Sequence, residues 1–330
     1  MIEAGFLTEF MDGAGARPAR TGAISKENTA MTNAAPHRWL LISLAAFASM
    51  LIEPAISRAQ PAQPAQTPEG IDPSIELIDP KVLRICADPR SLPFSNDKGE
   101  GFENKIAELF AEKLQKKLAY TYYPQASGFV RMTLAAHRCD LIMGVPQGDD
   151  LVQTTNPYYR TAYALVAKQG SGLDEVATLA DERLKSKRIG IVAGTPPATY
   201  MAANGLMTNA RPYSLMIDTR IDSSAAAMIK DLTSGEIDAG LLWGPMAGYF
   251  AKQASPPLHI EPLVKETSGP RLAYRIAMGV RPADQNWKRQ LNRLIQENQG
   301  AIDKILLDYG VPLLDESDKL IAAGMTTKRP

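Results

Sequence analysis

The stretch LRICADPRSLPFSNDKGEGFENKIAELFAEKLQ, residues 83–115, predicts a buried strand, a long loop and an amphipathic helix in that order. Its first residues form an apolar run with one polar break at Arg84, which is typical of a parallel strand covered on both faces. Apolar residues recur at helical spacing from Ile106 to Leu114. The loop follows the carboxyl end of the strand, where open parallel sheets bind ligands, so its length favours a functional role over a solvated connection. Phe94 in this loop is expected to be exposed.

The same alternation of strands and helices continues along the chain. Further strands are predicted at 118–123, 140–146, 156–170, 188–192, 235–245 and 272–280, and helices at 127–139, 173–186, after residue 195 and at 284–309. This order predicts βαβ crossovers and parallel sheets, the α/β class. RCDLIMGVP (138–146) and GEIDAGLLWGP (235–245) repeat one pattern of aspartate, apolar run and glycine, which indicates two similar lobes.

The second lobe is expected to be inserted into the first, with residues 163–168 and 272–280 as the two crossings of a hinge. The predicted domains are a leader and signal peptide at 1–59, a proline-rich lead-in at 60–80, lobe 1 at 81–168, lobe 2 at 169–272, the completion of lobe 1 at 273–314 and a loose tail at 315–330.

Residues 31–60 have the layout of a secretory signal peptide. His37 and Arg38 precede an apolar core at 39–52 that is too short to span a bilayer comfortably. Small residues suited to signal peptidase end at Ala59, so cleavage after Ala59 is expected to leave Gln60 as the mature start. Residues 1–30 are interpreted as an upstream extension or a start site placed too early. The predicted location is the periplasm, with no membrane span after removal of the signal.

Composition excludes some classes of partner. The 330 residues include 36 basic and 36 acidic side chains, and this balance argues against a nucleic-acid or anionic-membrane surface. The two cysteines, Cys86 and Cys139, have no metal-binding spacing. An oxidising compartment would allow them to pair, but their Cα separation could exceed the limit of about 7 Å, so the disulfide stays an open alternative.

At LRICADPRSLPFS, GEGFENKIAELFA, RCDLIMGVP, IVAGTPPATY and GEIDAGLLWGP the chain resembles the bilobal periplasmic solute-binding proteins of the polar amino-acid type. The resemblance covers residues 82–312. More narrowly, CADPRSLPFSN, GFENKIAE, GVPQG, PYYR, AGTPPAT, RPYSLM, WGPMAGYFAKQ and RIAMGVR resemble the MxaJ/XoxJ branch, which is associated with periplasmic quinoprotein methanol dehydrogenase. The resemblance implies a type II periplasmic binding protein, with two parallel-type sheets, flanking helices and a two-strand hinge.

In amino-acid receptors of this fold an arginine binds the carboxylate of the ligand, and an aspartate binds its ammonium group. This chain carries Asp149, Asp150 and Leu151 where the resemblance places the basic residue, and Trp243 where it places the acid. An arginine and a carboxylate are the simplest means of desolvating a zwitterion, so tight binding of an α-amino acid is not expected.

Eight residues are the candidates for the ligand cleft: Asp88, Phe94, Glu103, Arg131, Tyr158, Gly194, Thr195 and Trp243. Gly194 and Thr195 precede a helix whose free N–H groups can bind an anion. Pro196 and Pro197 remove two donors and equally fit a plain helix start.

The other cleft candidates also have structural interpretations. Three interpretations of Phe94 and Trp243 stay open: the rings stack on a ligand, anchor an interface, or pack between the lobes. Glu103 and Arg131 can equally be a first-turn acid and its salt partner.

Catalytic motifs are scarce. The histidines at 37, 137 and 259 are not paired at metal-ligand spacing, and no nucleophile elbow or phosphate loop occurs. The preferred hypothesis is a monomeric, non-enzymatic accessory protein of a quinoprotein alcohol dehydrogenase, whose partners include that enzyme and its cytochrome c, and whose cleft holds a small ligand or none. This chain is expected to carry no metal or cofactor of its own. The alternatives are the solute receptor of an ABC importer and a dehydratase-like enzyme using Asp88, Glu103 and Arg131.

Overall fold

The computed structural model describes residues 76–215 and 222–321. The predicted leader and signal peptide, the lead-in up to residue 75 and the last nine residues of the predicted tail lie outside the described residues.

Ten of the described strands pair in one sheet, in the order β4-β1-β5-β12-β7-β10-β8-β9, with β11 beside β7 and β6 beside β12. Their bounds are β1 Val82–Ala87, β4 Lys117–Tyr122, β5 Leu141–Pro146, β6 Gln153–Thr154, β7 Tyr159–Lys168, β8 Ile189–Val192, β9 Ala210–Tyr213, β10 Ala239–Trp243, β11 Leu258–Pro262 and β12 Ala273–Val280. Two short strands, β2 (Arg90–Ser91) and β3 (Ser95–Asn96), pair separately within the loop after β1.

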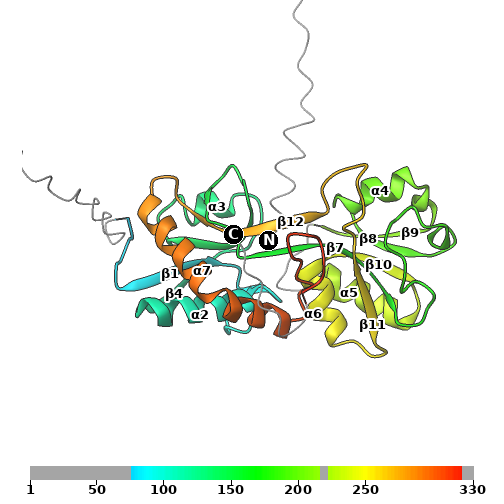
Figure 1. Cartoon of the computed structure of the whole chain (residues 1–330), viewed down its shortest axis with the longest axis horizontal. Coiled ribbons are helices and arrows are strands. Elements are labelled where there is room, and N and C mark those ends of the chain that lie inside the picture. Colours follow the sequence, from blue (N-terminus) through cyan, green and yellow to red (C-terminus); the bar gives the residue numbers. More distant parts are fainter. Residues whose placement is uncertain (1–75, 216–221, 322–330) are drawn as a thin grey trace, which may run out of the picture. The chain divides into compact units, whose positions relative to one another are not determined.

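The helices flank these strands (Figure 1). Their bounds are α2 Phe102–Leu114, α3 Phe129–Met132, α4 Pro197–Ala203, α5 Ser224–Ser234, α6 Gly244–Lys252 and α7 Gln285–Asp308, with 3-10 turns η2 at Glu182–Leu184 and η3 at Leu206–Asn209. In the described part of the chain, none of them combines the length and the apolar character that a membrane crossing requires.

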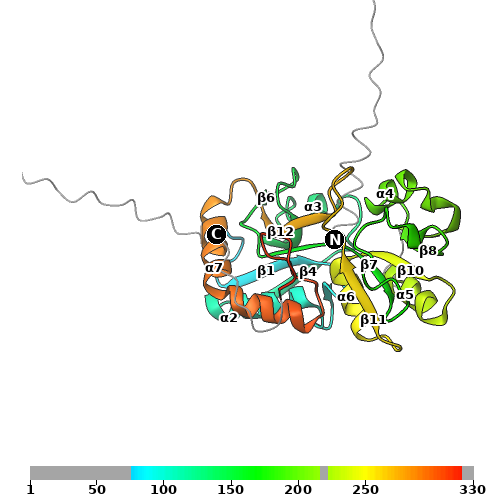
Figure 2. The same cartoon turned by 45° about the vertical axis from the view of Figure 1, so that its right-hand side comes forward.

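The predicted parallel pairing is confirmed on both sides of the sheet. Strand β1 pairs in parallel with β4 and β5, and β8 pairs in parallel with β9 and β10. The antiparallel strands β12 and β7 lie between these two groups (Figure 2). Because β7 pairs with β12 through residues 159–162 and with β10 through residues 163–167, the two expected sheets form one continuous set of hydrogen-bonded strands.

The repeated sequence pattern corresponds to a repeated backbone arrangement. The amide of Asp140 donates to the carbonyl oxygen of Arg84 at 2.9 Å, and the amide of Asp238 donates to that of Arg188 at 2.8 Å. In both places the aspartate directly precedes the apolar strand, β5 or β10. The matched hydrogen bonds support the interpretation of two similar units.

Two predicted helices are much shorter than expected. The helix expected at 127–139 is reduced to the single turn α3, because Thr133 leaves the helical conformation and its hydroxyl bonds back to the carbonyl oxygen of Phe129 at 2.7 Å. The helix expected at 173–186 is reduced to η2. Its apolar residues, Leu173, Val176, Leu179 and Leu184, are buried through turns rather than along one helical face. The prediction for α7 is confirmed to within one residue at each end.

The first residues of the expected loose tail are held against the two central strands. Leu314 bridges to Leu320, and its amide donates to the carbonyl oxygen of Arg160 in β7. Arg160 also forms an ion pair with Asp318, and Arg275 of β12 forms one with Glu316. Up to residue 321, therefore, the chain is anchored rather than loose.

Cys86 and Cys139 form a disulfide, with their Cα atoms 5.5 Å apart. Residue Cys86 is paired in register with Ile142, so the turn before β5 brings Cys139 next to β1. Both cysteines are buried in a small core cluster with Phe129 and Val145.

Removing this disulfide is expected to lower the free energy of unfolding by about 2 to 4 kcal/mol, because the bond restricts the unfolded chain. The measurement is urea unfolding of a Cys86→Ala/Cys139→Ala variant beside the oxidised wild type. Wild type unfolded in excess reductant serves as the control and should approach the variant. Equal unfolding midpoints in oxidised protein and variant would contradict the expectation.

Candidate functional site

A cavity of about 580 Å3 lies between the loop that follows β1 and the helices α5 and α6. The loop contributes Asp88 and Lys98, the N-cap of α5 contributes Ser223, and α6 contributes Tyr249. Its volume lies within the range of small-molecule sites. The predicted position of the site at the carboxyl end of β1 therefore coincides with a cavity.

Asp88 positions the loop that lines this cavity. Its buried carboxylate accepts the amide N–H of Arg90 at 2.8 Å and that of Gln125 at 2.7 Å. The Ser95 hydroxyl donates to the Asp88 carbonyl oxygen at 2.8 Å. Asp88 thereby links the loop after β1 to the segment after β4, and its main contribution to the site is to hold the loop in place.

Phe94 is buried, contrary to the expectation that it is exposed. Its side chain is 1% exposed and packs edge-on against Phe102, with ring centroids 5.3 Å apart. Gly101 allows this packing, since a Cβ atom there would come within 2.0 Å of the Phe94 carbonyl oxygen. Asn104 completes the loop, because its side-chain oxygen accepts the amides of Asn96 and Gly101.

Glu103 lies with Tyr158 and Tyr159 behind this loop. Burial raises the pKa of Glu103 to about 8, and the nearby charge of Asp88 adds to the shift. Burial also raises the pKa of both tyrosines, and Glu103 contributes to each shift. Oxygen Oε1 of Glu103 has no hydrogen-bond partner among the residues that the structure describes. These groups form a buried polar cluster that favours a protonated carboxyl.

Trp243, at the end of β10, is part of an aromatic cluster. Its ring packs edge-on against Tyr163 at 5.1 Å and against Tyr274 at 5.8 Å between centroids. Its side chain is 1% exposed, so it is not available to stack on a ligand or to anchor an interface, and it packs against rings of β7 and β12. Of the three interpretations, packing between the lobes agrees best with this burial. An indole therefore occupies the place where the resemblance implies an ammonium-binding aspartate.

Thr195 does not offer the free donors that an anion site requires. The Thr195 hydroxyl donates to the Val192 carbonyl oxygen at 2.7 Å, and the amide of Thr195 also points to that oxygen. The amide of Ala198 donates to the Thr195 carbonyl oxygen at 3.0 Å. With prolines at 196 and 197, the structure favours a plain helix start at this position.

Arg131 is exposed on α3 and is not the salt partner of Glu103. It lines a second hollow of about 390 Å3, which shares Gln125 and Ala126 with the first cavity. The structure thus places Asp88 at the first cavity and Arg131 at the second. It groups Glu103 with Tyr158 behind the loop.

The wall that α6 contributes to the cavity was missed by sequence reasoning. Met246, Tyr249, Phe250 and Gln253 line it at spacings of three, four and seven residues. This helical period is present in WGPMAGYFAKQ and could have revealed the wall. Within residues 76–215 and 222–321, no group of three or more His, Cys, Asp or Glu side chains is arranged to hold a metal ion.

The family model of the bacterial extracellular solute-binding proteins, family 3, matches residues 83–311. The chain belongs to this family. Among curated relatives, protein MoxJ of Methylorubrum extorquens AM1 is 29% identical over 276 residues, which cover 78% of this chain and 90% of MoxJ. The fold and the sequence both identify the chain as an extracellular solute-binding protein.

Two solved structures of the family are similar to this member. The periplasmic binding protein XoxJ from Methylobacterium extorquens AM1 is 42% identical with a TM-score of 0.61, covering 71% of this chain and 100% of XoxJ. MxaJ from Methlophaga aminisulfidivorans MPT is 27% identical, also with a TM-score of 0.61, covering 70% of this chain and 100% of MxaJ. The resemblance to this branch is thereby confirmed.

Proposed function

We propose that this solute-binding protein is a periplasmic, non-enzymatic accessory protein of a PQQ-dependent methanol dehydrogenase, on which it docks to support maturation or activity. The observation that carries the proposal is the 42% identity to XoxJ over the whole of that chain. The MoxJ and MxaJ matches point to the same branch. A buried disulfide is consistent with the oxidising periplasm.

The composition of the site supports a role other than amino-acid uptake. Asp149, Asp150 and Leu151 stand where the resemblance implies a carboxylate-binding arginine, and the apolar side chain of Leu151 is 58% exposed. Trp243 stands where the resemblance implies the aspartate, and it is buried among aromatic rings. A zwitterion would lose its hydration without the two charges that normally replace it.

A titration of the protein into purified methanol dehydrogenase of the same cell tests the proposal. We expect saturable association together with a change in the specific activity or in quinone loading of the enzyme. An amino-acid receptor of the same family is the control and should neither associate nor alter activity. The proposal fails if no association occurs at high micromolar concentrations. A solute that raises the unfolding temperature in a screen would then indicate the importer receptor.

A further inference from the structure

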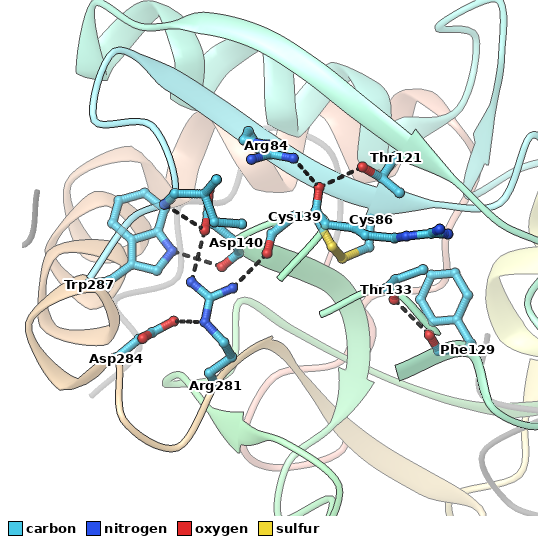
Figure 3. Close-up of a disulfide and its surroundings, with 12 residues drawn as sticks. Arg84, Cys86, Thr121, Phe129, Thr133, Cys139, Asp140, Arg281, Asp284 and Trp287 are labelled. Carbon is cyan, nitrogen blue, oxygen red and sulfur yellow. Dashed lines mark hydrogen bonds and ion pairs between the residues drawn. A yellow bond between two sulfur atoms is a disulfide. The ribbon is translucent and has the colours of Figure 1, made fainter. Parts of the chain in front are cut away.

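The second hollow, of about 390 Å3, lies between the segment around α3 and the end of β5 with the turn that follows. Its walls are mostly apolar: Phe129, Val130, Ala135, Ile142, Val145 and Pro146. Three of these side chains belong to the core cluster that contains the Cys86–Cys139 disulfide. Figure 3 shows Phe129 beside this disulfide. The apolar floor of the hollow is therefore fixed by packing and by a covalent bond.

Arg131 supplies the positive charge of the hollow. Its guanidinium takes part in none of the ion pairs among the described residues. Gly128 lies next to it, and a Cβ atom there would come within 3.3 Å of Nη2. The absence of a side chain at Gly128 leaves the guanidinium room beside the apolar wall. An unpaired arginine at the edge of an apolar hollow is suited to a carboxylate.

Asp149 is the acidic residue that lines the hollow, and it forms no ion pair with Arg131. Its Oδ1 accepts the amide of Leu151 at 2.8 Å, which holds the turn after β5. Burial raises the pKa of Asp149, and the charge of Asp150 adds to the shift. The hydrogen bond from the Leu151 amide opposes these two effects and engages the carboxyl group within its own turn.

The rim adds hydrophobic surface that is open to solvent. Leu151 lines the hollow and is 58% exposed, and Met132, which follows Arg131 on α3, is 38% exposed. They are two of the five large apolar side chains that are exposed in the described part of the chain. Of the two, Leu151 lines the hollow, so it extends the apolar wall outward and can cover the hydrocarbon part of a bound molecule.

We propose that this hollow binds a small monocarboxylate with an apolar body, whose carboxylate pairs with Arg131 and whose hydrocarbon part packs on Phe129, Val145 and Leu151. This ligand class follows from the lining of the hollow. A guanidinium and an apolar wall are present, and an ammonium group would lose its hydration against that wall. The cation comes from α3, not from the turn after β5 where amino-acid receptors carry their arginine. The proposal goes beyond the accessory function and does not depend on it.

Three related probes test which charged groups of a ligand the hollow recognises. 3-Phenylpropionate carries a carboxylate and an apolar body, 3-phenylpropionamide lacks the charge, and phenylalanine adds an ammonium group. We expect saturable calorimetric binding of 3-phenylpropionate, with the amide and phenylalanine each weaker by about ten-fold or more. Octanoate tests whether an aliphatic body is accepted.

Variants locate the binding in this hollow. Arg131→Gln is expected to weaken 3-phenylpropionate about ten-fold and to leave the amide unchanged, because it removes only the charge. Leu151→Ser should weaken both probes, and its exposed position makes misfolding improbable. Arg90→Gln, in the first cavity, is the control and should bind as wild type does.

Several results would overturn the proposal. They are no binding of 3-phenylpropionate or octanoate at millimolar concentration, equal affinity for the amide, and binding that survives Arg131→Gln. If Arg131→Gln instead weakens association with methanol dehydrogenase while no carboxylate binds, the hollow belongs to a protein partner. The dehydrogenase titration contains no carboxylate probe, so failure of one proposal is distinguishable from failure of the other.

Discussion

Replacing Arg281 with methionine is expected to lower the free energy of unfolding by about 3 to 5 kcal/mol. Nη2 of Arg281 lies 2.8 Å from Oδ1 of Asp140, and Nε lies 2.7 Å from the carboxylate of Asp284 (Figure 3). All three side chains are at most 8% exposed. Methionine fills a similar volume but leaves two buried carboxylates without a counter-charge. Chemical denaturation with a matched measurement of secondary structure checks this expectation.

An exposed arginine–aspartate pair provides the control for this variant. Arg188 forms an ion pair with Asp238, the aspartate that precedes β10 as Asp140 precedes β5, at 2.9 Å, but the Arg188 side chain is 52% exposed. Arg188→Met should leave the unfolding midpoint nearly unchanged, because solvent screens an exposed pair. A triple variant, Asp140→Asn/Arg281→Met/Asp284→Asn, should regain stability relative to Arg281→Met alone. Equal losses for Arg281→Met and Arg188→Met would contradict the role of burial.

The stability of the protein is expected to fall as the pH rises from about 4.5 to about 8, by up to about 1.4 kcal/mol per pH unit. The cause is Glu103, whose pKa burial raises from 4.5 to about 8. Below pH 4.5 both states hold the proton. Between the two values the folded state keeps the proton that the unfolded state has lost, so rising pH favours unfolding. Above about 8 both states are ionised and the contribution of this group becomes constant.

Glu103→Gln checks this expectation, because glutamine has the shape of a protonated glutamate. Its unfolding free energy should equal that of wild type near pH 4.5 and exceed it by up to about 5 kcal/mol at pH 8. Glu108→Gln on the same helix is the control, since its carboxylate is 49% exposed and paired with Lys105. Parallel stability curves for wild type and Glu103→Gln would show that Glu103 is not the group that titrates.

Much of the fold could be predicted, because it depends on local periodicity. The apolar spacing of α7 and the alternation of strands and helices need no distant contact. The position of the cavity also followed from a general rule, the carboxyl end of the parallel strand β1. The prediction of a helix over 127–139 was wrong beyond its first turn. The Thr133 hydroxyl donates to the Phe129 carbonyl oxygen, and apolar spacing does not reveal such a local side-chain hydrogen bond.

The identity of the site residues depended on contacts that the sequence does not contain. Whether Phe94 and Trp243 face a ligand or the core is decided by rings from distant elements, Phe102 for the first and Tyr163 for the second. The pairing of the two cysteines stayed open because it depends on the register between β1 and β5. The hollow beside Arg131 likewise arises only when α3 and β5 meet.

The burial of the disulfide has a consequence for the order of events during export. Cys86 and Cys139 are at most 1% exposed, so in the folded chain neither sulfur is accessible to an oxidase or to a small thiol. The bond must therefore form while the translocated polypeptide is still incompletely packed. Recombinant production in a reducing cytosol would deliver buried thiols that added oxidant reaches only through transient opening. Oxidative folding in a secretory compartment is the appropriate route to the native protein.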